Sequence, residues 1–195
     1  MGRRRDQITT YLTSSERGMT SCDNAQRRVR LGDADTLQSA STMIFQSEKN
    51  LVDRFVSLLQ TDQTPWGKVT FSREFDYSRG RTDVIAVAET NTVIAVEAKL
   101  EDWKYALHQA YRNTCFAHHS FVLLPKKTAL TAMSFLAEFE RRSVGLCYID
   151  EASLVVLHDS PRSAPLEPWL ASEAISRVRR SNRDTCQPQP TPWNQ

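Results

Sequence analysis

Two short apolar segments separated by only three residues constrain the fold of this chain more than any other feature. Residues 83–88 (DVIAVA) and 92–99 (TVIAVEAK) are almost wholly apolar, and 89–91 (ETN) lie between them. Apolar residues at consecutive positions are typical of strands that are covered on both faces. We therefore expect the two segments to form a β-hairpin at the centre of a layered α/β domain.

The segments around this hairpin show helical or strand periodicity. Residues 47–60 predict an amphipathic helix with Ser47 as its N-cap, and its expected apolar face comprises Leu51, Phe55, Leu58 and Leu59. Residues 69–77 alternate as a strand does, which places Val69, Phe71, Phe75 and Tyr77 on one side, and Glu74 and Asp76 on the other. The later expected elements are a helix over 101–113, a strand over 120–125, a helix over 129–142, strands over 144–149 and 153–157, and a short helix over 169–180.

The length of 195 residues suits one domain with appendages. We expect a flexible basic and polar arm over 1–40, a folded domain over 41–160, and a C-terminal extension over 161–195 that ends in a disordered tail. The arm carries arginine clusters at 3–5 and 27–30. It is either a solvated leader or a segment that contacts phosphates.

Composition excludes several classes of protein. The net charge of +2 is far below that of a histone-like protein, so any affinity for nucleic acid has to come from the distribution of charge. The four cysteines are too widely spaced for a zinc site or a disulfide framework, which predicts reduced thiols. No segment approaches the roughly 20 apolar residues that cross a bilayer. The sequence therefore predicts a soluble, cytoplasmic protein without a membrane partner.

The register of the central hairpin brings charged residues together. With a three-residue loop over 89–91, Ala88 pairs with Thr92, and Asp83 then lies opposite Glu97. Directly opposed residues share a face, with their Cβ atoms roughly 5 Å apart. Lys99 lies two residues beyond Glu97 and shares that face. Two carboxylates and an ammonium group are therefore expected at one end of the hairpin.

Opposed carboxylates need a compensating positive charge, because like charges directly opposite each other destabilise a sheet and desolvated carboxylates cost several kcal/mol each. Lys99 supplies part of this charge. A hard divalent cation such as Mg²⁺ would supply the rest, since it prefers oxygen ligands. The simpler alternative is an ion pair between Glu97 and Lys99 on the face of a strand.

These motifs resemble the PD-(D/E)XK nuclease superfamily, which has the restriction-endonuclease-like fold. The resemblance rests on residues 81–83 (RTD), 96–99 (VEAK) and 109–111 (QAY), and it covers roughly residues 44–159. The order of elements agrees as well: a helix with Glu48, a strand, the hairpin, a helix, a strand and a helix. Thr82 stands where the signature proline would be. The resemblance implies a central mixed β-sheet flanked by helices.

The resemblance also implies a site and a reaction. Asp83, Glu97 and the Ala98 carbonyl would hold Mg²⁺ or Mn²⁺, with Glu48 near the metal. Lys99 would orient or deprotonate the attacking water, and Gln109 would hold the lysine or contact the substrate backbone. The reaction would be hydrolysis of phosphodiester bonds in DNA, with RNA not excluded. A homodimer is a further expectation, because cutting both strands commonly takes two sites. The candidate phosphate contacts are Arg79, Arg81 and Lys104.

Structural roles compete with these assignments. Glu48 is also explained as a first-turn acid that complements the helix dipole, and Gln109 as a helix-surface glutamine. Arg79 and Arg81 fit solvated turn residues equally well. At the level of function, the alternatives are a nuclease-fold protein that binds nucleic acid or a protein partner without cutting, and a small interaction protein with an incidental motif.

Overall fold

The computed structural model describes residues 44–186 except 79 and 152, so the predicted basic arm, Arg79 and the end of the C-terminal tail lie outside the described residues. The described chain contains α1 (Glu48–Gln60), β1 (Val69–Tyr77), β2 (Gly80–Ala88), β3 (Val93–Ala98), α2 (Trp103–Asn113), β4 (His119–Leu124), α3 (Lys126–Met133), α4 (Leu136–Arg142), β5 (Gly145–Asp150), β6 (Ser153–His158) and α5 (Pro168–Cys186). The expected mixed α/β class is confirmed.

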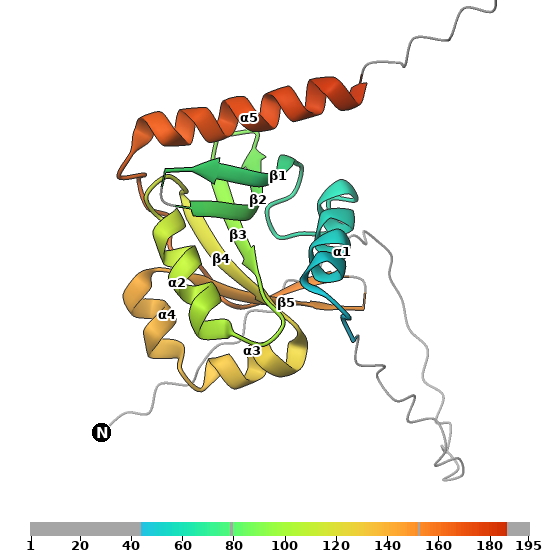
Figure 1. Cartoon of the computed structure of the whole chain (residues 1–195), viewed down its shortest axis with the longest axis vertical. Helices are drawn as coiled ribbons and strands as arrows, with labels where there is room; N and C mark the ends of the chain where they lie inside the picture. The colour runs from blue at the N-terminus through green and yellow to red at the C-terminus, as the bar shows by residue number, and fades with distance from the viewer. Residues whose placement is uncertain (1–43, 79, 152, 187–195) are drawn as a thin grey trace, which may run out of the picture. The chain divides into compact units, whose positions relative to one another are not determined.

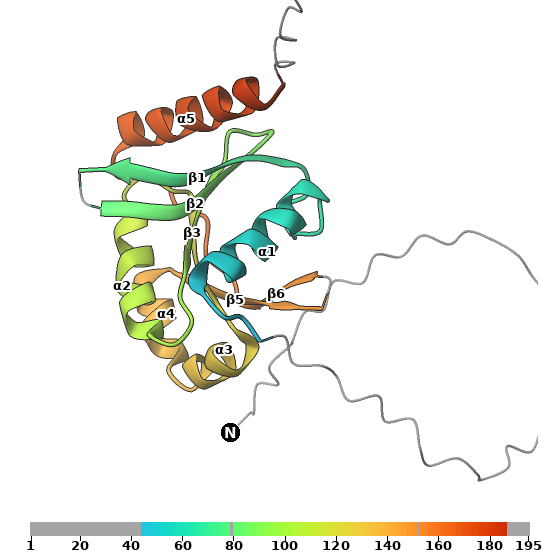
Figure 2. The same cartoon turned by 45° about the vertical axis from the view of Figure 1, so that its right-hand side comes forward.

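The six strands form one sheet in the order β1-β2-β3-β4-β5-β6. β3 pairs in parallel with β4, and β4 with β5, whereas the other neighbours are antiparallel. One face of the sheet packs against α1, and α2 to α5 lie on the other face (Figures 1 and 2). Within β3, Ile94 and Val96 point toward α1, while Val93 and Ala95 point toward the opposite cluster. The central strands are therefore covered on both faces, as predicted.

The turn between β2 and β3 has the three-residue form that the register prediction assumed. The Ala88 amide donates to the Thr92 carbonyl at 3.0 Å, and Asn91 adopts a left-handed conformation with φ 59°. This conformation is typical of the last residue in such a loop. The ladder then runs from Val87↔Val93 to Val84↔Val96. The predicted register is confirmed over these four pairs.

Two helices differ from the sequence prediction. The single helix expected over 129–142 is wrong: α3 ends at Met133, and α4 begins at Leu136. The break lets the Phe135 ring lie 5.0 Å from the Trp103 ring, while Phe139 remains buried. In a continuous helix, the rings of Phe135 and Phe139 would both project from the same straight axis. The C-terminal helix is longer than expected, and its residues Leu170, Ala171, Ala174 and Val178 join the core cluster under β1 and β2.

The prediction of which side chains of β1 share a face of the sheet is wrong for the second half of the strand. Val69 and Phe71 pack on the α1 side of the sheet, but Phe75 and Tyr77 pack on the α5 side. Glu74 explains the change, because it adopts a left-handed conformation with φ 51° inside the strand. In the β1–β2 ladder, Glu74 and Asp83 are correspondingly unpaired, although the pairs on either side of them keep the same register and neither strand has an extra residue. This irregularity turns the end of the β1–β2 hairpin toward α2.

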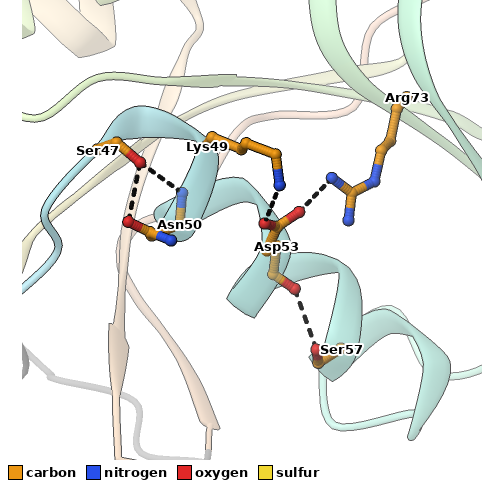
Figure 3. A network of polar contacts seen from close by, with 6 residues as sticks. All are labelled: Ser47, Lys49, Asn50, Asp53, Ser57 and Arg73. Atoms are coloured by element: carbon orange, nitrogen blue, oxygen red, sulfur yellow. Dashed lines mark hydrogen bonds and ion pairs between the residues drawn. The ribbon is translucent and has the colours of Figure 1, made fainter.

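Polar contacts tie α1 to β1 (Figure 3). The Ser47 hydroxyl accepts a hydrogen bond from the Asn50 amide at 3.1 Å, which confirms Ser47 as the N-cap. Asp53 lies between Lys49 of its own helix, at 2.7 Å, and Arg73 of β1. These contacts, together with the buried face of α1, set the position of the helix start and therefore of Glu48.

Two further findings bear on the expected class of protein. Within the described part of the chain, no helix combines the length and the apolar composition needed to cross a membrane. Cys147 is buried, and its thiol is free.

Glu74→Val is expected to destabilise the protein by about 1–3 kcal/mol, because a β-branched residue is disfavoured at positive φ. Glu74→Gly should be at least as stable as the wild type, since glycine adopts this conformation without strain. Urea denaturation measures both. Asp76→Val is the matched control, an exposed acid on the same strand outside the left-handed region. Equal losses in Glu74→Val and Asp76→Val would contradict the assigned role of Glu74.

Candidate functional site

Asp83 and Glu97 meet at the end of the β2–β3 hairpin. They directly follow Val84↔Val96, the last pair of the β2–β3 ladder, and the charge of Asp83 acts on the Glu97 carboxyl group. The Asp83 Oδ2 atom also accepts from the Ala98 amide at 2.9 Å. Glu97 is only 1% exposed. The structure therefore brings the two predicted acids together.

Asn113, at the end of α2, holds Glu97 in place. Its Nδ2 atom donates to Glu97 Oε1 at 2.6 Å, while its Oδ1 atom accepts from the Tyr77 hydroxyl at 2.7 Å and from the Thr82 hydroxyl at 2.9 Å. Two hydroxyl donors on Oδ1 establish which end of the amide faces Glu97. The other carboxyl oxygen of Glu97, Oε2, is buried and receives no hydrogen bond within the described chain.

The electrostatics of the pair follow from its burial. Removal from water raises the pKa of Glu97 to about 8, and the charge of Asp83 adds to this effect. The hydrogen bond from Asn113 and the charge of Lys99 act in the opposite direction. Burial also raises the pKa of Asp83, against the hydrogen bond from the Ala98 amide. The metal-free pair is therefore an unfavourable place for two negative charges.

Lys99 reaches the site from the end of β3 and binds Glu48 of α1. Its Nζ atom lies 2.7 Å from Glu48 Oε2. Burial lowers the pKa of Lys99, but the hydrogen bond to Glu48 and the charges of Glu48, Asp83 and Glu97 outweigh it and leave the pKa raised. Lys99 is thus an ammonium group that interacts with all three acids. The simpler alternative of an ion pair between Glu97 and Lys99 is not what the structure has, because the ammonium group of Lys99 contacts Glu48 directly.

Gln109 lies on the face of α2 that borders these groups. It is four residues from Tyr105 and from Asn113, so the three share one helical face. The Tyr105 ring centroid is 5.9 Å from Lys99 Nζ, and Asn113 contacts Glu97. Gln109 Oε1 is buried and has no hydrogen-bond partner within the described chain. An unpaired buried acceptor is costly, which makes it available for a donor on a ligand or on Lys99.

The predicted phosphate contacts are more dispersed. Arg81 is exposed on β2 with its guanidinium 3.9 Å from Glu74, and Lys104 is exposed on α2, where its ammonium lies 5.6 Å from the Trp103 ring centroid. Arg79 lies outside the described residues. Sequence reasoning missed Arg112, whose guanidinium nitrogen lies 2.9 Å from the place that a Cβ on Gly80 would take. Arg112 thus adds a cation beside the end of the β1–β2 hairpin.

Sequence reasoning also missed Asn113, Tyr77 and Thr82 as supports of the acid pair. A signal for Asn113 exists, because it follows Gln109 by four residues and ends the same helix face. No comparable signal exists for Tyr77 and Thr82. Their contact with α2 depends on the left-handed residue Glu74 in the preceding strand.

The donor set fits a hard divalent cation with few protein ligands. Within the described residues, no three histidine, cysteine, aspartate or glutamate side chains form a metal-binding group. Two carboxylates with a backbone carbonyl are nevertheless a usual set for Mg²⁺, which keeps several waters and binds substrate phosphate directly. The buried Oε2 atom of Glu97 accepts no hydrogen bond from the described residues, so its lone pairs are left for such an ion.

Comparisons with known proteins bear on the fold alone. No family model and no curated protein matches the chain. Among solved structures, the chain is similar to a protein of unknown function from Silicibacter pomeroyi, with a TM-score of 0.52 and 16% sequence identity. The match covers 74% of this chain and 92% of the other. The similarity supports the α/β fold and assigns no activity.

Glu97→Gln is expected to stabilise the metal-free protein, because the amide keeps the bond from Asn113 and can donate to Asp83. The folded-state pKa of Glu97, about 8, lies above its ordinary value of 4.5, so the wild type loses stability as pH rises through this interval. Glu97→Gln lacks this loss, so its free energy of unfolding should exceed that of the wild type by on the order of 2–4 kcal/mol at pH 8. Chemical denaturation in EDTA at several pH values measures it.

Glu101→Gln serves as the control, because Glu101 is exposed and its substitution should change stability by less than about 0.5 kcal/mol. An advantage of Glu97→Gln that stays constant from pH 5 to pH 8, or a loss of stability, would contradict the assigned burial of this charge.

Proposed function

We propose that this protein is a metal-dependent nuclease of the PD-(D/E)XK type that hydrolyses phosphodiester bonds of DNA. The observation that carries the proposal is the convergence of Asp83, Glu97 and Lys99 at one end of a buried hairpin. A sequence that served only for folding would gain by replacing the Glu97 carboxylate with an uncharged group. Retaining it is consistent with a ligand that needs two carboxylates. On this proposal, the sheet has the restriction-endonuclease-like fold.

The proposed roles follow from the contacts of each residue. Asp83, Glu97 and the Ala98 carbonyl would hold Mg²⁺ or Mn²⁺, and the ion would polarise the phosphate and acidify a bound water. Asn113 keeps Glu97 Oε1 engaged and leaves Oε2 for the ligand. The ammonium of Lys99 would orient the attacking water and stabilise negative charge on the phosphate.

Glu48 and Gln109 would position Lys99. The 2.7 Å contact with Glu48 anchors the ammonium from the α1 side, and the unpaired Oε1 of Gln109 offers an acceptor from the α2 side. A substrate phosphate that approached Lys99 would share the ammonium with both residues. Arg81 and Arg112 would then supply positive charge for the substrate backbone near the end of the β1–β2 hairpin.

Cleavage of plasmid and single-stranded DNA with Mg²⁺ or Mn²⁺ tests the proposal. We expect Lys99→Ala to lower the rate by at least about 100-fold, the lower limit for losing a group that acts in proton transfer or orients the water. The matched control is Lys127→Ala, an exposed lysine on α3 that should cut at the wild-type rate.

Two outcomes would contradict the proposal. One is the absence of cutting with either metal, which would favour a protein of this fold that binds without hydrolysis. The other is cutting that survives unchanged in Lys99→Ala, which would show that the activity does not belong to this site.

A further inference from the structure

Residues of α2, residues of α4, and Phe135 just before α4 form a groove lined by aromatic and basic side chains. It has a volume of about 330 Å³ and is lined by Trp103, Lys104, Leu107, His108, Phe135, Glu138 and Arg142. The rings of Trp103 and Phe135 lie 5.0 Å apart, and Phe135 is 46% exposed, although it is large and apolar. An exposed aromatic face of this kind offers a surface on which a planar ligand can stack.

The charge of the groove is positive. Lys104 Nζ lies 5.6 Å from the Trp103 ring centroid and 6.0 Å from that of Phe135, so its ammonium is held beside both rings. The single acid among the lining residues, Glu138, is bonded to both Arg141 and Arg142. The groove therefore offers a cation next to aromatic faces, which suits an anionic ligand that also carries flat rings.

An exposed tyrosine beside the candidate catalytic lysine follows the groove residue Lys104 along α2. Tyr105 follows Lys104 directly on α2, is 52% exposed, and has its ring centroid 5.9 Å from Lys99 Nζ. Successive residues of a helix are turned by about 100°, so Lys104 lies between Tyr105 and Trp103 around the first turn of α2. We treat Tyr105, Lys104, Trp103 and Phe135 as one surface, with Tyr105 beside Lys99 at one end and the groove at the other.

We propose that this surface binds an unpaired stretch of nucleic acid, with one base stacked on Tyr105, another on Phe135, and a phosphate between them at Lys104. The inference rests on the proposed function for the class of ligand and adds to it the preference for single strands. Stacking on aromatic side chains needs bases whose faces are free, and these exist in single strands but not within a duplex. The aromatic residues would have no comparable use with a substrate that stays fully paired.

Fluorescence anisotropy with a short labelled oligothymidine in EDTA tests the proposal without cutting. We expect Tyr105→Ala and Phe135→Ala each to weaken binding about tenfold, the change typical of losing one base stack. Tyr111→Ala is the matched control, a tyrosine on the same helix that is 49% exposed, does not line the groove, and should bind as the wild type does. A duplex of the same length should bind more weakly and should not distinguish Tyr105→Ala from Tyr111→Ala.

Phe135→Leu separates stacking from folding. Leucine keeps an apolar contact with Trp103 but has no aromatic face, so this variant should unfold close to the wild-type temperature and still lose oligothymidine affinity. The proposal would be overturned if Phe135→Leu and Tyr105→Ala, each tested alone, both bound oligothymidine with wild-type affinity. It would also be overturned if the wild-type protein bound the duplex as tightly as oligothymidine.

The outcome is distinguishable from that of the nuclease proposal. Metal-dependent cutting that needs Lys99, combined with unchanged binding by Tyr105→Ala and Phe135→Ala, would overturn this inference and leave the nuclease. Binding that needs Tyr105 and Phe135, combined with no cutting, would support this inference and overturn the nuclease proposal.

Discussion

The burial of Glu97 beside Asp83 is the constraint on which the rest of the site depends. Two carboxyl groups lie next to a ladder whose paired residues, 84–87 and 93–96, are all apolar, and one of the two groups is almost completely removed from water. Each desolvated charge costs several kcal/mol unless other groups compensate it. The surrounding groups supply only part of that compensation: the Asn113 side chain donates one hydrogen bond to Glu97, the Ala98 backbone amide donates another to Asp83, and Lys99 adds a positive charge.

The supports of this pair come from distant parts of the chain. Tyr77 and Thr82 orient the Asn113 amide, and they reach it because the β1–β2 hairpin turns at Glu74. Backbone strain of this type is found at functional sites, where surrounding structure maintains it. Glu48 approaches from the opposite face of the sheet, on a helix tied to β1 through Asp53 and Arg73. The ammonium of Lys99 thus lies between an acid on α1 and the acid pair.

Local patterns predicted the parts of the fold that depend on neighbouring residues. The three-residue loop determined the register that opposes Asp83 and Glu97, and Ser47 marked the start of α1, because turn and cap chemistry act over a few residues. The alternation of apolar residues in β1 failed at Glu74, since a left-handed residue inside a strand leaves no trace in a pattern of period two. The break between α3 and α4 was missed for a related reason. It depends on the contact of Phe135 with Trp103, which lies on another helix.

The candidate site likewise combines features that depend on neighbouring residues with features that depend on distant contacts. Asp83, Glu97 and Lys99 lie within one hairpin, so their proximity was predictable, whereas Asn113 and Arg112 join the site through the packing of α2 against the sheet. The sequence predicted that Glu97 and Lys99 share a face. The preference of the ammonium for Glu48 arises from the placement of α1, which depends on the whole core beneath it.

Anomalous X-ray diffraction from crystals of the protein soaked in Mn²⁺ tests whether Asp83 and Glu97 bind a metal ion together. We expect one anomalous peak that contacts a carboxylate oxygen of Asp83 and the Oε2 atom of Glu97, with the Asn113 bond to Glu97 Oε1 intact. A peak elsewhere, no peak at Mn²⁺ concentrations that saturate ordinary carboxylate sites, or side chains of Asp83 and Glu97 that point to opposite faces of the sheet would contradict it.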